Sequence, residues 1–187
     1  MRILIVDNYD SFTYNLYHLL NQFVDNIEVI RNDKIDLYKI NKYDKIVLSP
    51  GPGLPSESNL MIPLIKDFSQ SKSILGICLG CQAIGQVFGC NLLNLSNVKH
   101  GISSKLTIID PTDTLFKNIQ NPIHVGHYHS WVIDHKFFSE DLKITAKSND
   151  LIMAISHKTY DLKGLQFHPE SILTNQGTLM VKNWLFS

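Results

Sequence analysis

The architecture of this chain is decided by one stretch, Ile74-Leu75-Gly76-Ile77-Cys78-Leu79-Gly80-Cys81-Gln82. Its first four residues form a continuous apolar run of strand length, and residues 79–88 predict a helix. Cys78 lies at the junction, with one glycine two positions before it and another two positions after it. Small flanking residues permit the strained strand-to-helix turn called a nucleophile elbow. Such a turn lifts the sulfur out of the sheet.

The segments before this stretch alternate between strand and helix patterns. Apolar runs at 3–6, 27–30 and 45–48 have the length of strands that are buried on both faces. After the first run, Asp10 or Ser11 is expected to cap a helix. The apolar stripe of that helix consists of Phe12, Leu16, Leu19, Leu20 and Phe23. A second helix is expected beyond the loop at 49–55. This alternation predicts a parallel sheet with helices on both faces.

The second half of the chain has a different texture. After residue 90, β-rich segments are expected around 104–109, 123–133, 142–147, 151–157 and 164–167, and a last helix near 176–186. No linker, repeat or low-complexity stretch interrupts them. We therefore expect residues 1–187 to form one domain of the α/β class, with three α/β/α layers around a central, mostly parallel mixed sheet.

Composition and charge exclude several classes of function. Lys plus Arg equals Asp plus Glu at 17 each, so there is no electrostatic case for binding nucleic acid or an anionic membrane. No apolar run approaches the roughly 18 residues of a membrane-spanning helix. The N-terminal segment reads as a strand and not as a signal peptide. The chain has three cysteines, an odd number that argues against a secreted disulfide scaffold. We expect a cytoplasmic protein.

Cys78 is the first candidate for chemistry. The helix that begins behind it directs free N–H groups and the helix dipole toward the sulfur, and both stabilise a thiolate. The plain alternative is a buried, inert cysteine with glycines that serve packing. The glycine spacing and the place between strand and helix favour the reactive interpretation.

A histidine near the end of the chain is the second candidate. The stretch Gln166-Phe167-His168-Pro169-Glu170-Ser171 follows a predicted strand, and the proline favours an extended conformation at His168. Residues i and i+2 of an extended segment point the same way, so Glu170 is placed to hold the imidazole. A carboxylate there fixes the tautomer and turns the other nitrogen toward a nucleophile. The alternative is a loop histidine beside a turn proline.

The third candidate is the loop Ser49-Pro50-Gly51-Pro52-Gly53-Leu54-Pro55. Its backbone N–H groups are suited to one half of an oxyanion hole, and the N–H of Leu79 to the other half. The same groups would suit a phosphate, but the helix-opening G-K-[ST] of a P-loop is absent. A plain strand-to-helix connection is the remaining alternative.

Together these three motifs resemble the class I, or triad-type, glutamine amidotransferases over essentially the whole chain. The stretches 7–16, 128–130 and 166–174 are similar to the small subunits of anthranilate synthase and aminodeoxychorismate synthase. The resemblance implies that Cys78 forms the γ-glutamyl thioester, that His168 is the general base and that Glu170 orients it. It also implies that glutamine contacts five positions in addition to Leu79: Gly51, Gly53, Gln82, Ser130 and Trp131. From residue type alone, Gln82 would also make sense as a polar helical residue and Trp131 as a core aromatic, but the functional interpretation is favoured for each.

Three positions depart from the family pattern. Cys81 stands where histidine is frequent, His127 where arginine is usual and Ile102 where lysine is common. None belongs to the triad, so they bear on the partner-facing surface and the tuning of activity. The spacing of Cys78 and Cys81 is that of a dithiol redox motif, which predicts a disulfide on mild oxidation; the alternative is that Cys81 packs as a small apolar residue.

Other classes of function were weighed against the amidotransferase. The C-x-x-C at 78–81 also resembles a thioredoxin-type redox motif. A metal site on Cys78, Cys81 and Cys90 lacks a second ligand pair. A non-catalytic relic domain would be expected to lose the nucleophile. The glycine-flanked elbow and the H-P-E stretch favour the amidotransferase over all three.

The resemblance also implies the partners. L-glutamine is the expected substrate, no cofactor or metal is expected in this chain, and ammonia is passed to a large chorismate-converting subunit that uses Mg²⁺. The residues 157–161 and the context of Trp131 favour anthranilate synthase, in tryptophan biosynthesis. The alternatives are aminodeoxychorismate synthase, in folate biosynthesis, or a subunit that serves both enzymes.

Overall fold

The computed structural model describes residues 1–187, and its centre is an eight-stranded sheet. Five strands are parallel, in the order β2 (Ile27–Arg31), β1 (Ile3–Asp7), β3 (Lys45–Leu48), β4 (Ser73–Ile77) and β10 (Leu162–Leu165). Three antiparallel strands continue the sheet: β9 (Leu151–His157), β8 (Leu142–Ser148) and β6 (Thr107–Ile108). The expected mixed and mostly parallel sheet is confirmed.

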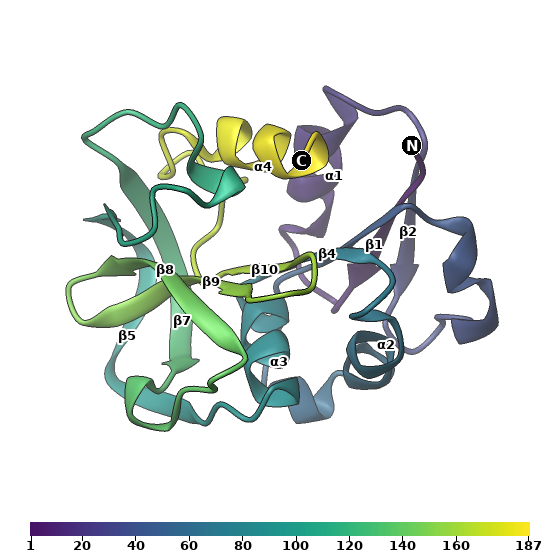
Figure 1. The fold of residues 1–187 in the computed structure, drawn as a ribbon, viewed down its shortest axis with the longest axis horizontal. Helices are drawn as coiled ribbons and strands as arrows, with labels where there is room; N and C mark the ends of the chain where they lie inside the picture. Colours follow the sequence, from purple (N-terminus) through teal and green to yellow (C-terminus); the bar gives the residue numbers. More distant parts are fainter.

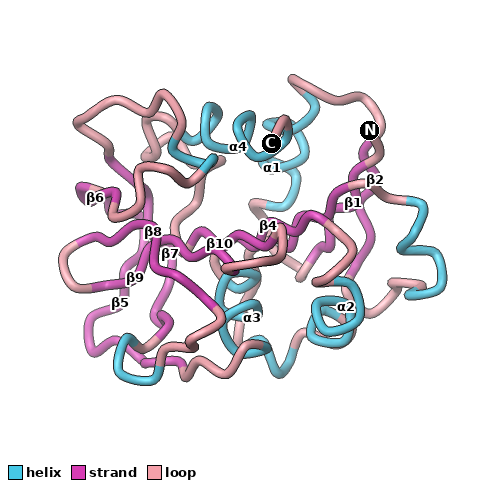
Figure 2. Tube along the Cα trace, viewed as in Figure 1, coloured by secondary structure: helices cyan, strands magenta, loops and turns pink.

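Helices cover both faces of this sheet, as the alternation predicted (Figure 1). The helices α1 (Thr13–Asn21) and α4 (Gly177–Leu185) lie on one face, and α2 (Met61–Phe68) and α3 (Leu79–Val87) lie on the other. Figure 2 shows the short 3-10 turns that complete the loops: Leu37–Lys42, Pro55–Glu57, Thr114–Phe116 and His135–Phe137. None of the helices combines the length and the apolar character needed to cross a bilayer.

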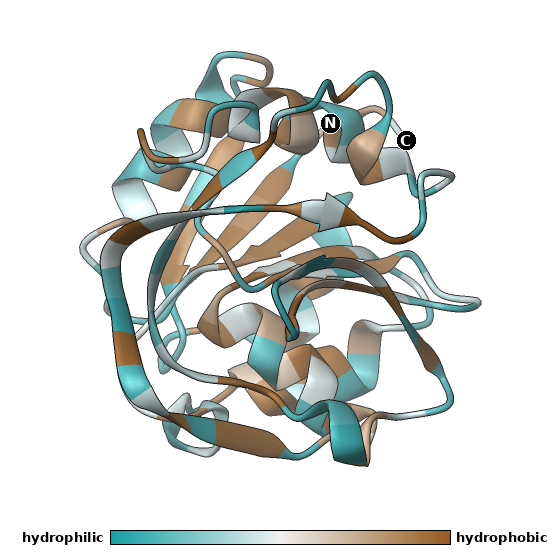
Figure 3. Ribbon diagram, turned by 90° about the vertical axis from the view of Figure 1, so that its left-hand side faces the viewer, coloured by the Kyte–Doolittle hydropathy of each residue, from teal (hydrophilic) through white to brown (hydrophobic).

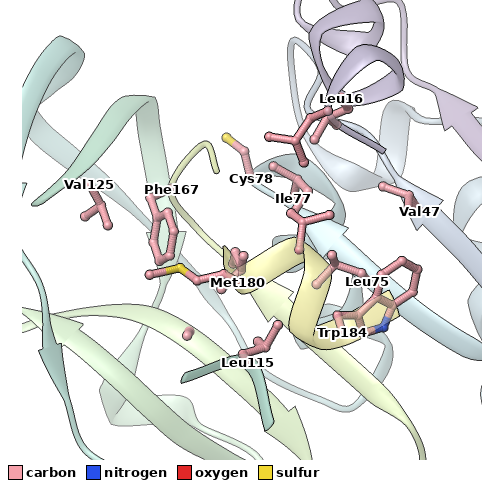
Figure 4. Packing of buried hydrophobic residues seen from close by; sticks show 14 of the residues in the cluster. Leu16, Val47, Leu75, Ile77, Cys78, Leu115, Val125, Phe167, Met180 and Trp184 are labelled. Carbon is pink, nitrogen blue, oxygen red and sulfur yellow. The ribbon is translucent and has the colours of Figure 1, made fainter. Parts of the chain in front are cut away.

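The sheet separates two apolar cores. One lies under α1 and α4 and contains Cys78, Phe167 and Trp184 (Figure 4). The other lies under α2 and α3 and contains Leu48 and Cys81. Figure 3 shows the apolar colour on the central strands, between faces that carry more polar residues. Burial on both faces is the reason that the parallel strands read as continuous apolar runs.

The β-rich second half differs from the expectation in one large respect. The strand expected at 104–109 begins much earlier, because β5 runs from Leu92 to Lys105 and β6 covers only Thr107–Ile108. β5 pairs with β7 (His124–Ile133) in a separate two-stranded sheet. Most residues of β5 are exposed and polar, so the strand lacks the apolar signal by which a sequence pattern is recognised.

The predicted cap of the first helix was also misplaced. The N-cap residue is Phe12, and it makes no side-chain capping bond. The Asp10 carboxylate instead accepts the Phe12 N–H at 2.8 Å, and the Asp7 carboxylate accepts the Thr13 hydroxyl at 2.8 Å. The turn before α1 is therefore closed by acidic side chains that lie outside the helix.

Candidate active site

The strand-to-helix turn at Cys78 has the strained geometry that the sequence predicted. Cys78 has φ 51° and ψ −101°, a region that non-glycine residues avoid, and it is the N-cap of α3. A Cβ on Gly76 would lie 2.5 Å from the Gly80 backbone, and a Cβ on Gly80 would lie 2.6 Å from the Leu48 carbonyl. Both glycines are therefore required because backbone segments approach closely around the elbow.

His168 and Glu170 form a buried pair directly after β10. His168 Nδ1 and Glu170 Oε1 are 2.7 Å apart, and both side chains are almost fully buried. The backbone of His168 is fixed from two sides, because its N–H donates to the Gly126 carbonyl at 3.1 Å and its carbonyl accepts the Thr174 hydroxyl at 2.6 Å. The carboxylate thus holds the imidazole as the sequence predicted.

The second ring nitrogen of His168 is available to the cysteine. His168 Nε2 is buried and has no hydrogen bond of ordinary geometry. Burial alone would lower the pKa of His168, but the Cys78 thiol and the Glu170 carboxylate beside it raise that pKa to about 10. The imidazole is therefore held in its protonated form next to the Cys78 sulfur.

Two aromatic rings enclose this imidazole. The ring of Tyr128 meets the ring of His168 edge-on at 4.9 Å, and Phe12 does the same at 5.4 Å. The Tyr128 hydroxyl lies 3.1 Å from the Ser171 hydroxyl. Sequence reasoning placed Phe12 in an apolar helix stripe and gave Tyr128 no role. Both rings pack against the imidazole of His168.

A pocket of about 150 Å³ opens beside Cys78. It is lined by all six positions expected to contact glutamine, together with the sulfur and three neighbours: Gly51, Pro52, Gly53, Cys78, Leu79, Gln82, Tyr128, His129, Ser130 and Trp131. Leu79 is the first residue of α3, so its N–H has no partner within the helix and is free for an oxyanion. The structure brings the predicted substrate residues together around one pocket. His168 and Glu170 are not among the residues that line it.

Sequence reasoning missed one residue that touches the nucleophile. The side-chain N–H of Gln166, which is buried, donates to the Cys78 sulfur at 3.6 Å. Its carbonyl lies 3.2 Å from Gln82 Nε2, which also donates to the Trp131 carbonyl at 2.8 Å. Gln166 therefore connects the sulfur to the wall of the pocket. The signal was a polar residue at the end of a buried strand, where an apolar one is usual.

The three departures from the family pattern occupy different environments. The Cys81 sulfur points at Gly164 of β10, where an added Cβ would lie 2.7 Å from it, and burial raises its pKa well above the usual value. Cys81 also belongs to the core on the opposite face of the sheet from Cys78, so the geometry favours packing over a disulfide. Ile102 is 42% exposed, whereas His127 is 3% exposed and so does not belong to the surface.

These features define a class of protein: an α/β enzyme whose candidate nucleophile, Cys78, lies at an elbow with a His-Glu pair beside it. Comparison with protein families identifies the particular family. The model of the class I glutamine amidotransferases matches residues 4–187, so the chain belongs to that family. The chain is an enzyme of the glutamine amidotransferase type.

Individual relatives agree with this assignment. The chain is 43% identical to anthranilate synthase component 2 of Porphyra purpurea, with 99% of each chain covered. It is also 43% identical to aminodeoxychorismate synthase component 2 of Klebsiella aerogenes, with 98% of each chain covered. Among solved structures, a glutamine amidotransferase of Thermotoga maritima shares the fold, with a TM-score of 0.75 at 18% identity over 100% of this chain and 81% of that chain.

Proposed function

We propose that this chain is the glutaminase subunit of a chorismate-converting synthase, and that this synthase is anthranilate synthase. The observation that carries the proposal is the pocket that combines the Cys78 sulfur with every position expected to hold glutamine. The relatives named anthranilate synthase component 2 and aminodeoxychorismate synthase component 2 support the type of partner.

The first half of the reaction uses the ion pair of the site. The Cys78 thiolate attacks the side-chain amide carbon of bound glutamine, and the backbone N–H of Leu79 stabilises the oxyanion together with the N–H groups of the 51–53 loop. The protonated His168 then gives its proton to the departing nitrogen. Ammonia leaves, and a thioester remains on the sulfur.

The second half restores the enzyme. His168, now neutral, takes a proton from water, and the resulting hydroxide attacks the thioester carbon. Collapse of the tetrahedral intermediate returns the thiolate and releases glutamate. Glu170 keeps the imidazole oriented through both halves, because its carboxylate holds Nδ1 at 2.7 Å. This chemistry requires no metal or organic cofactor in the chain.

The acceptor of the ammonia lies outside these residues. The amidotransferase family model matches residues 4–187, and the relatives named component 2 support a large partner subunit, to which we assign the chorismate site and its Mg²⁺. Sequence identity does not choose between the two synthases, because both kinds of relative reach 43%. We favour anthranilate as the product because residues 157–161 resemble the subunits of tryptophan biosynthesis. The alternatives are aminodeoxychorismate as the product, or a subunit that serves both enzymes. The three free thiols fit the reducing cytoplasm.

Reconstitution with each large subunit tests the proposal. In the productive complex, Cys78→Ala should abolish synthesis from glutamine and leave synthesis from high ammonium intact, because only the glutaminase site is lost. Cys90→Ala is the matched control, since it removes a buried thiol that lies apart from the pocket. Loss of both activities in a folded Cys78→Ala complex would contradict the role of Cys78. The subunit that yields product from glutamine identifies the synthase.

A further inference from the structure

A chain of four side chains runs inward from the second sheet, and the triad does not use it. On β7, His127 Nδ1 lies 3.1 Å from His129 Nε2. His127 Nε2 lies 2.6 Å from the Ser104 hydroxyl, which in turn lies 2.6 Å from the Ser148 hydroxyl. His127, His129 and Ser148 are each at most 5% exposed. The chain joins β7, β5 and β8, and each of its links lies within hydrogen-bond distance.

The inner end of this chain reaches the glutamine pocket. His129 lines that pocket together with Cys78. Its Nδ1 is buried and has no hydrogen-bond partner, although the rest of the ring is fixed by the bond to His127. An unpaired ring nitrogen on a residue that lines a substrate pocket is a candidate acceptor for a water molecule.

The outer end reaches the molecular surface. Ser104, His127 and Ser148 line a second pocket of about 20 Å³, which also includes the exposed Asn149. A pocket of this size, with several polar side chains in its lining, has room for about one water molecule. The four side chains therefore link His129, which lines the glutamine pocket, to this second pocket beside the exposed Asn149.

The chemistry of the proposed reaction creates a need for such a path. Hydrolysis of the thioester yields a carboxylic acid, which ionises to glutamate at neutral pH and leaves one proton behind. That proton cannot leave on the ammonia, because only neutral ammonia is a nucleophile for an acceptor. Each turnover therefore leaves one excess proton at the site, in addition to the proton that returns to His168.

We propose that Ser148, Ser104, His127 and His129 form a proton relay that carries this excess proton from the glutamine pocket to the surface. The inference rests on the proposed function. The carboxylic O–H bond breaks and an N–H bond forms at His129 Nδ1, directly or through one pocket water. His129 Nε2 then passes its proton to His127 Nδ1, and His127 Nε2 passes its own to Ser104. The hydroxyl proton of Ser104 moves to Ser148, and that of Ser148 moves to the surface water.

The electrostatic surroundings suit transfer without storage of charge. Burial lowers the pKa of His127 to about 4, with the charges of Lys99 and His168 acting in the same direction. Burial lowers the pKa of His129 to about 3, and His127, His168 and Lys99 reinforce the effect, while the Trp131 backbone opposes it weakly. Both rings are neutral at physiological pH, so each has one N–H and one free nitrogen, which is the state that a relay requires.

The test compares variants in the complex with the synthase subunit. His127→Gln retains groups that can hydrogen-bond to both neighbours but cannot relay a proton. The kcat for glutamate release should fall roughly tenfold, which is less than the ~10²–10⁴-fold effect of groups that act in the transition state. The KM for glutamine should not change, and imidazole added at constant pH should restore part of the rate. His124→Gln, an exposed position on the same strand, is the matched control and should resemble wild type in every respect.

Ser104→Ala interrupts the same path at its outer end and provides a second variant should His127→Gln misfold. Its kcat should fall to a similar extent, and the double variant should be no slower than the slower single one, because both changes block one path. Unchanged kcat in both single variants, losses that multiply, or a change confined to KM would overturn the relay while the glutaminase stands. A wild-type complex that releases no glutamate overturns the proposed function and the relay with it.

Discussion

At the scale of single residues, the sulfur of Cys78 is held by more than its triad partners. Gln166 donates to it at 3.6 Å from the end of β10, and the same side chain accepts from Gln82 in the pocket wall. A hydrogen bond to an ionised group contributes about 1.5–3 kcal/mol, more than a bond between neutral groups. Gln166 is therefore a positioning residue that favours the thiolate and aligns it with the substrate.

Replacement of Gln166 by leucine tests this role. Gln166→Leu keeps the size of the side chain but removes the donor to the thiolate, so kcat for glutaminase should fall by about 10–100-fold. The KM should change little, because Gln82 keeps its bond to Trp131. The pH profile of the rate at which iodoacetamide alkylates Cys78 should shift toward higher pH. Gln86→Leu, exposed on α3, is the control; an unchanged alkylation profile in Gln166→Leu would contradict the role.

The buried histidines also make a prediction about stability and pH. His127 and His129 stay neutral in the folded chain down to about pH 4 and about pH 3, whereas they protonate near 6.5 when unfolded. The unfolded state therefore binds more protons below pH 6.5, and stability is lost as the pH falls toward these folded pKa values. Urea midpoints measured from pH 7 to about 4.5 should fall for wild type and fall less steeply for His127→Gln. Parallel curves for the two proteins would be the contrary result.

At the scale of elements, the elbow depends on how closely α3 approaches the sheet. Gly80 lies against the Leu48 carbonyl and Cβ of β3, with no room for a methyl group. Gly85, on the same helix, faces the far end of the flexible Ile133 side chain instead. An added methyl group would therefore clash with rigid backbone at Gly80, whereas at Gly85 the Ile133 side chain can move to accommodate it.

A matched pair of alanine variants measures this difference. Alanine is a better helix former than glycine by about 0.8–1.0 kcal/mol, so helix propensity alone predicts that both variants gain stability. The clash at Gly80 reverses the sign: Gly80→Ala should lose about 1–3 kcal/mol and most glutaminase activity, because the backbone at Cys78 must shift. Gly85→Ala should remain close to wild type. Thermal unfolding and glutamate release are the readouts, and a stabilised Gly80→Ala would show that the approach is not tight.

At the scale of the whole molecule, the site lies where the parallel sheet meets the second sheet. Cys78 comes from the end of β4, His168 follows β10, and Ser130 and Trp131 come from β7. The backbone bridge between Gly126 and His168 joins the two sheets at this place. Ile172 lies two residues beyond Glu170 and is 97% exposed, so an apolar side chain projects to solvent close to the catalytic pair.

We expect Ile172 to contact the large synthase subunit. Ammonia must pass to the acceptor without escape, so the partner has to cover the surface near the triad, and burial of the Ile172 side chain in that contact would remove apolar area from water. Ile172→Asp should weaken the complex by tenfold or more in Kd, at about 1.4 kcal/mol per decade, without change in the melting temperature of the isolated chain. Ile109→Asp, 50% exposed on a distant loop beside β6, is the control. Equal affinity of both variants would contradict the assignment.

The sequence by itself determined the parallel half of the fold, the elbow, the His-Glu pair and the family. These features are local: an apolar run, glycines at fixed spacing around Cys78, and a proline after His168 each constrain nearby backbone directly. Tertiary structure alone decided the partner of β5, the contact between Gln166 and a sulfur 88 residues away, and the direction of the Cys81 thiol. It also decided the link from His127 to Ser104 and Ser148. Such contacts depend on which elements pack together. Polar residues on an exposed strand carry no periodic signal that would reveal the packing partner of that strand.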